Sequence, residues 1–103
     1  MWGKPIYLWQ PRAKLPNPVT APTALSLTYT GSAQTLHTAG SVPSGTLQYK
    51  LDGTNVWSYL PVSATNAGTY TVYWRVKSGS WDSETYQDPN PASGSINCVI
   101  GAV

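Results

Sequence analysis

The first 22 residues constrain the fold of this chain more than any other segment, because prolines interrupt them throughout. The five prolines are Pro5, Pro11, Pro16, Pro18 and Pro22. Proline fixes φ at about −65° and pushes the residue before it toward extended geometry. Helix is therefore excluded over residues 1–22. We expect an extended arm there, followed by a separate domain at residues 23–103.

The arm also carries the side chains of a docking segment. Its three cations occur without an acid, and a short apolar run, residues 6–10, lies between two of the prolines. We expect eight arm residues to bind a partner: Trp2, Lys4, Ile6, Tyr7, Leu8, Trp9, Arg12 and Lys14. The apolar side chains would fill pockets, the cations would meet an acidic surface, and the apolar run would add a strand to a partner sheet. Alternatively, this run folds back on its own domain as an extra strand.

Residues 23–103 show the alternation and the turn signals of a sandwich of short strands. Strands are expected at residues 25–29, 33–38, 46–51, 56–60, 69–77, 81–86 and 95–100. In the strongest, residues 69–77, Tyr70, Val72, Trp74 and Val76 share one face, which we expect to be buried. About seven strands without a helical period predict an all-β, Greek-key sandwich.

The net charge of +2 is unevenly distributed. The arm carries +3, whereas residues 23–103 hold three cations and four acids, which leaves them at −1. Three arm cations are a thin footprint for nucleic acid, which is bound through denser Lys/Arg patches. No segment approaches the ~20 apolar residues of a membrane span, and the N-terminus lacks the apolar run of a secretory signal. We expect no nucleic-acid partner, no membrane partner and no secretion under a signal of its own.

Residues that could support catalysis or bind a metal are sparse. Cys98 is the only cysteine, so no intrachain disulfide can form, and its alternation with Ile96 and Ile100 predicts a buried side chain. His37, the only histidine, is expected on the solvent face of its strand, opposite Leu36. Phosphate-binding glycine loops and nucleophile motifs are absent from the sequence. We expect no enzymatic activity, no metal and no cofactor.

Two motifs resemble those of a known family. They are residues 27–34, Leu-Thr-Tyr-Thr-Gly-Ser-Ala-Gln, and residues 65–72, Thr-Asn-Ala-Gly-Thr-Tyr-Thr-Val. The stretch from Leu27 to Val76 resembles the immunoglobulin-like repeats of bacterial surface proteins and bacteriophage structural proteins. This resemblance implies an immunoglobulin-like sandwich in which Gly68 permits a corner and Tyr70 fastens it by a hydroxyl hydrogen bond. Val72 stands where antibody domains carry a cysteine.

The resemblance and the arm together predict a non-enzymatic structural protein of a bacteriophage virion, either a capsid decoration protein or a minor structural protein. The arm would anchor the chain to the major capsid protein or to another virion component, with the sandwich displayed on the particle surface. A single module without a secretory signal favours a protein made in the host cytoplasm. Repetition over a symmetric particle, self-association included, would multiply weak contacts.

The alternative is an adhesive module whose sandwich loops bind a host-surface glycan or protein, with the arm as a linker. Such modules use exposed aromatic side chains. The candidates are Trp57, Tyr59, Tyr73, Trp81 and Tyr86. Strand alternation predicts that Tyr70 and Trp74 are core residues, whereas Tyr73 and Trp57 are expected to be exposed.

Overall fold

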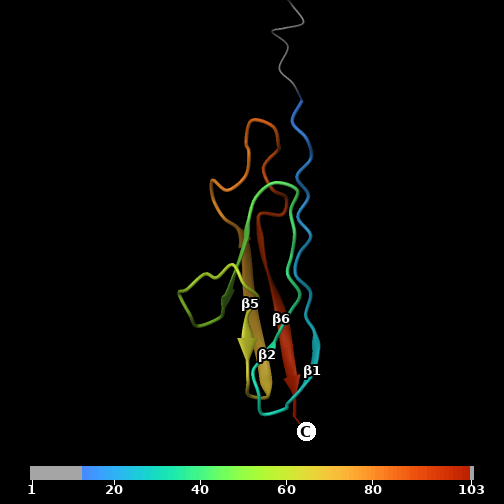
Figure 1. The fold of residues 1–103 in the computed structure, drawn as a ribbon, viewed down its shortest axis with the longest axis vertical. Helices are drawn as coiled ribbons and strands as arrows, with labels where there is room; N and C mark the ends of the chain where they lie inside the picture. The colour runs from blue at the N-terminus through green and yellow to red at the C-terminus, as the bar shows by residue number, and fades with distance from the viewer. Residues whose placement is uncertain (1–12, 103) are drawn as a thin grey trace, which may run out of the picture.

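The computed structural model describes residues 13–102, which form an all-β fold of two sheets (Figure 1). The strands are β1 (Ser26–Thr28), β2 (Gln34–Thr35), β3 (Leu47–Leu51), β4 (Ser63–Ala64), β5 (Gly68–Val76) and β6 (Ser93–Gly101). One sheet has the order β1-β6-β5-β3, and β2 pairs with β4 in the other. These residues contain no helix, and hence none that could cross a membrane. The predicted all-β class is confirmed, and the two sheets are consistent with a β-sandwich.

The long strand β5 forms the centre of the larger sheet. It pairs antiparallel with β3 on one side and with β6 on the other. Val72, Trp74 and Val76 are buried, whereas Tyr73 on the opposite face is 37% exposed, so the predicted alternation is confirmed for these residues. Tyr70, predicted to be a core residue, is only partly buried and packs against the core. The rest of the core comes from β3, β6 and the residue after β2: Leu36, Leu47, Tyr49, Cys98 and Ile100. The predicted burial of Cys98 is thus also confirmed.

The predicted strand at residues 56–60 is wrong. A single bridge forms there, in which Ser58 and Tyr49 exchange backbone hydrogen bonds of 2.8 and 2.9 Å. Val56 and Leu60 are 74% and 72% exposed. Because no second layer covers these side chains, nothing holds a continuous strand in register, and residues 52–62 form a projecting loop (yellow-green in Figure 1).

The predicted strand at residues 81–86 is also wrong, because local hydrogen bonds fold this segment into a turn. The Asp82 carboxylate accepts the Glu84 amide at 3.2 Å, and the Asp82 carbonyl accepts the Tyr86 amide at 2.9 Å. Asp side chains favour such turns because they bond the backbone two residues on. Conversely, the sequence does not predict β4, since Ser-Ala carries no apolar alternation and its pairing with β2 is set by tertiary contact.

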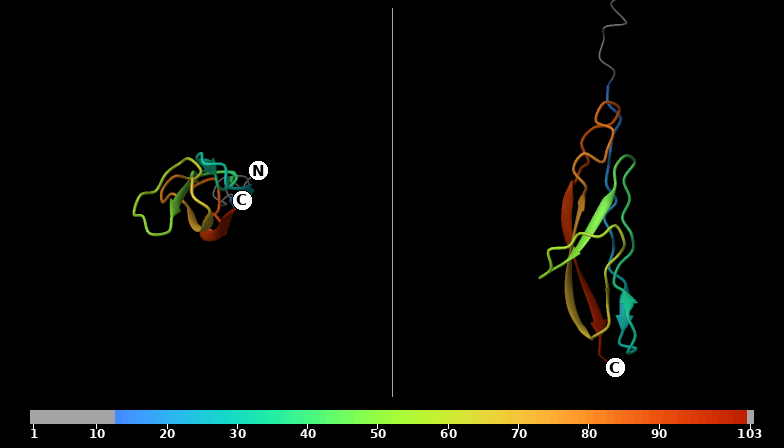
Figure 2. Two further views of the ribbon diagram at one scale, coloured as in Figure 1. Left: turned by 90° about the horizontal axis from the view of Figure 1, so that it is seen from below. Right: turned by 60° about the vertical axis from the view of Figure 1, so that its left-hand side comes forward.

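Residues 13–22, the described part of the predicted arm, lie against the sandwich. The Leu15 amide donates to the Thr85 carbonyl at 2.8 Å. The Asn17 side chain, only 3% exposed, exchanges two hydrogen bonds of 2.9 Å with the backbone of Ser44. Figures 1 and 2 show this segment (blue) running alongside the sandwich from the end that carries the loop before β6. From Leu15 onward, therefore, the chain is hydrogen-bonded to the domain.

The chain then changes sheets. Thr20 pairs antiparallel with Ser41, and Ala24 with His37, which lies just beyond β2. Shortly afterwards β1 pairs parallel with β6 in the larger sheet. One continuous stretch therefore ties both layers together along one edge of the sandwich.

His37 is not the solvent-facing residue that the sequence predicts, because it is only 1% exposed. Regular β2 pairing ends at Thr35, so the alternation does not extend to His37. Its Nε2 accepts the Val62 amide at 3.0 Å, which requires the ring proton to be on Nδ1, and Nδ1 donates to the Thr38 carbonyl at 2.8 Å. The His37 ring therefore continues the pairing of β2 and β4 beyond the end of their backbone ladder.

The corner before β5 has the hydrogen bond that the sequence motif predicts. The Tyr70 hydroxyl donates to the Asn66 carbonyl at 2.6 Å. Gly68, between them, has a φ of 151°, a conformation in which a side chain would be strained. The hydroxyl thus ties the end of the loop to the strand that begins at Gly68.

We expect Tyr70→Phe to lower the free energy of unfolding by about 1 kcal/mol, because it removes one hydrogen bond and leaves the ring in place. Urea denaturation followed by tryptophan fluorescence measures the change. Tyr29→Phe is the matched control, since Tyr29 is 40% exposed and lies outside the corner. Equal stability of the two variants would show that the hydroxyl does not stabilise the corner.

Candidate binding surface

All three cations of residues 23–103 lie on the outer face of the larger sheet. Lys50 is on β3, Arg75 is on β5, and Lys77 directly follows β5. Their positions alternate with the buried Tyr49, Trp74 and Val76, so the same pleat that forms the core turns the cations outward. The register brings β3 and β5 side by side, with Lys50 opposite Tyr73.

Aromatic rings lie among these cations. The Arg75 guanidinium carbon is 4.1 Å from the centre of the Trp57 ring, and the Lys50 ammonium is 5.3 Å from it. Lys50 is also 5.6 Å from the Tyr73 ring, and Lys77 is 5.7 Å from the Tyr59 ring. These are cation–π distances. We call this surface the basic aromatic face and define it as Lys50, Trp57, Tyr59, Tyr73, Arg75 and Lys77.

Trp57 reaches this face from the projecting loop, not from a strand. The Ser58–Tyr49 bridge holds the loop against β3, and Trp57 is half-buried over the sheet, not exposed as the sequence predicts. Arg75 is further fixed by Gln48, whose side-chain oxygen accepts the Arg75 Nε–H at 2.9 Å. The Trp57 ring and the Arg75 guanidinium are therefore already held in position in the protein without a ligand.

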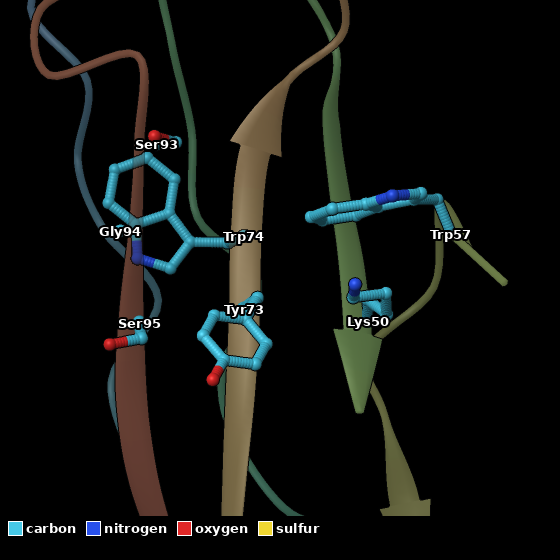
Figure 3. Close-up of a pocket in the computed structure, with 7 residues that line it drawn as sticks. All are labelled: Lys50, Trp57, Tyr73, Trp74, Ser93, Gly94 and Ser95. Carbon is cyan, nitrogen blue, oxygen red and sulfur yellow. The ribbon is translucent and has the colours of Figure 1, made fainter. Parts of the chain in front are cut away.

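An open pocket of about 410 Å³ lies on this face (Figure 3). Trp57 and Lys50 line one side, Tyr73 and Trp74 of β5 lie between, and Ser93, Gly94 and Ser95 of β6 line the other side. In Figure 3 the Trp57 ring is seen nearly edge-on, with the Lys50 ammonium beside it. The pocket therefore offers aromatic surface, a positive charge and small hydroxyl groups together.

Most of the acids lie together in one loop. Three of the four, Asp82, Glu84 and Asp88, are in the loop between β5 and β6, and Asp52 is in the turn after β3. A hydrogen bond from the Thr85 side chain holds the pKa of Asp82 below its usual value. The neighbouring Lys77 ammonium likewise lowers the pKa of Tyr59. Positive charge thus gathers on the basic aromatic face, apart from the acidic loop.

The predicted anchoring residues fall almost entirely outside the described part of the chain. Lys14 is described and is exposed. The remainder, which are Trp2, Lys4, Ile6, Tyr7, Leu8, Trp9 and Arg12, lie outside the described residues. Anchoring through them stays a prediction.

The candidate chemical residues of the core have structural roles. Both ring nitrogens of His37 are engaged by backbone groups. Burial raises the pKa of the Cys98 thiol, which favours its neutral form. Within residues 13–102, no three His, Cys, Asp or Glu side chains are grouped as metal ligands would be.

No protein-family model, curated protein or solved structure matches this chain. Its function is therefore inferred from the arrangement of the described residues and from the sequence.

The basic aromatic face could have been found in part from the sequence. Period-two alternation in β3 and β5 gives Lys50, Tyr73 and Arg75 the same outward direction, and their pairing follows once the two strands are neighbours. The position of Trp57 could not have been found from the sequence, because the sequence predicts a strand at residues 56–60 where the structure has a loop. Trp81, a candidate of the adhesive hypothesis, packs against the core instead.

Proposed function

We propose that the sandwich is an immunoglobulin-like Greek key. Three features support this topology. Ala24 bridges His37 beside the smaller sheet, and β1, which follows it, pairs parallel with β6 in the larger sheet. In the larger sheet, β6, β5 and β3 are consecutive neighbours. The Tyr70 corner before β5 is a further feature of that fold. Val72, which stands where antibody domains carry a cysteine, is completely buried, as is Leu36.

We infer that the protein is a non-enzymatic structural component of a bacteriophage virion, anchored through its N-terminal arm, with the sandwich displayed. The observation that best supports this proposal is that the chain from Leu15 onward is held along the sandwich by hydrogen bonds of Leu15 and Asn17. The described chain begins at one end of the sandwich, and the C-terminus lies at the other (Figure 1). A partner that holds the preceding aromatic residues would therefore present the sandwich end-on, and the fastened segment would transmit that orientation.

Co-sedimentation with phage particles stripped of this protein tests the anchoring. We expect the wild-type chain to pellet with the particles and a Trp2→Ala/Trp9→Ala variant to stay in the supernatant, because the two largest apolar contacts of the arm are lost. Substitution is preferable to removal of residues 1–22, since removal would also break the Asn17 hydrogen bonds.

Trp57→Ala is the matched control, because it removes a tryptophan from the sandwich and leaves the arm unchanged. It should pellet like the wild type. If the double arm variant pellets equally well, the arm is not the anchor. If the wild-type chain itself stays in solution, the virion assignment is wrong.

A further inference from the structure

The basic aromatic face has the charge of a site for an anionic ligand. It gathers Lys50, Arg75 and Lys77, while three of the four acids lie in the loop at the end of the sandwich and the fourth, Asp52, is in the turn that follows β3. Arg75 bonds a neutral amide, that of Gln48, so this contact leaves its positive charge uncompensated. Charge complementarity therefore favours an acidic partner on this face.

A peptide strand would not find a backbone template there. The backbone of β5 is paired on one side with β3 and on the other with β6. The free edge of β3 is partly covered by the Ser58–Tyr49 bridge. Peptides that add a strand need an unpaired edge. The outer face instead offers only side chains, which suits a ligand recognised through its own rings, hydroxyls and charges.

A single-stranded nucleic acid is also a poor fit. Such ligands stack bases on free aromatic faces within a strongly positive groove. Here the Trp57 ring already has the Arg75 guanidinium 4.1 Å from its centre and Lys50 at 5.3 Å. Three cations also give a sparser charge than a phosphate backbone requires.

Small hydroxyl groups line the pocket next to its aromatic surface. Ser93 and Ser95 line its β6 side, and Tyr73 presents an exposed ring between them and Lys50. Hydroxyl groups next to an aromatic surface match a sugar ring, which has polar edges and an apolar C–H face. A pocket of about 410 Å³ lies within the size range of small-molecule sites.

We propose that the basic aromatic face binds an acidic glycan whose carboxylates meet Lys50 and Arg75 while a sugar ring lies on Tyr73 beside Ser93 and Ser95. Arg75 and Trp57 are held in place by Gln48 and by the loop bridge, so little side-chain freedom is lost on binding. This inference goes beyond the anchoring function and does not depend on it, because the face lies on the sandwich and not in the arm.

Titration calorimetry of the full-length chain with alginate oligosaccharides, which are polyuronates, tests the proposal without any particle. We expect binding that weakens as salt rises, because the attraction between charges is screened. Tyr73→Ala and Lys50→Gln should each weaken it by about tenfold, through loss of the ring surface and of one charge respectively. Both side chains lie outside the core, so these variants are expected to fold.

Tyr29→Ala is the matched control, as an exposed tyrosine away from this face, and should bind like the wild type. Dextran, polyglutamate and a single-stranded thymidine oligonucleotide serve as neutral, peptidic and nucleic-acid comparators. The proposal is overturned if the wild-type chain does not bind alginate, if any comparator binds as tightly, or if Tyr73→Ala and Lys50→Gln leave the affinity unchanged.

Discussion

His37→Phe is expected to lower the free energy of unfolding by about 3 kcal/mol, although the new side chain is apolar and similar in size. The substitution leaves the Val62 amide and the Thr38 carbonyl without the ring nitrogens that now bond them at 3.0 and 2.8 Å. Each polar group left unsatisfied in a buried place costs roughly 1–3 kcal/mol. Phenylalanine can keep the ring contact with Tyr49, now 4.9 Å between centres, so the loss isolates the hydrogen bonds.

Equilibrium urea denaturation measures this effect, with Thr35→Val as the control. Thr35 lies two residues away on β2 and is exposed, so its replacement should change stability little. His37→Ala should cost more than His37→Phe, because it adds a cavity to the two lost hydrogen bonds. If His37→Phe is as stable as the wild type, the imidazole only fills space and does not extend the pairing of β2 and β4.

The error over His37 shows where strand alternation stops being a guide. Alternation correctly predicted the buried and exposed faces of β5, because nine paired residues keep the pleat regular. The regular pairing of β2 covers only Gln34 and Thr35. Beyond it, burial depends on what covers the chain, and both Leu36 and His37 are covered. In a short strand, alternation therefore predicts the burial of the paired residues and not the burial of the residues that follow.

The predicted boundary between arm and domain at residue 22 shows what proline content can and cannot predict. Proline content correctly excluded helix from residues 13–22, since it acts through local geometry. It could not predict that Asn17 would be buried and bonded to Ser44, 27 residues further on. An asparagine in a proline-rich stretch gives no periodic signal. Only the folded partner loop reveals that this segment belongs to the sandwich.

The second prediction with a large expected effect concerns Gly94, which pairs with Trp74 across β5 and β6. We expect Gly94→Ala to lower the free energy of unfolding by about 2–3 kcal/mol through overpacking. An added Cβ would lie 2.7 to 2.9 Å from three indole atoms of Trp74, a buried ring with little room to move. In most strands the same substitution would stabilise, because alanine loses less backbone entropy on folding than glycine.

Two further variants make this expectation specific to the indole. Gly101→Ala, on the same strand, should be nearly neutral, because its Cβ would meet only the Leu27 carbonyl oxygen at 3.4 Å. Gly94→Ala placed in a Trp74→Phe background should cost less than about 1 kcal/mol, since the clashing indole atoms are gone. An equal penalty in both backgrounds would locate the strain in the β6 backbone instead.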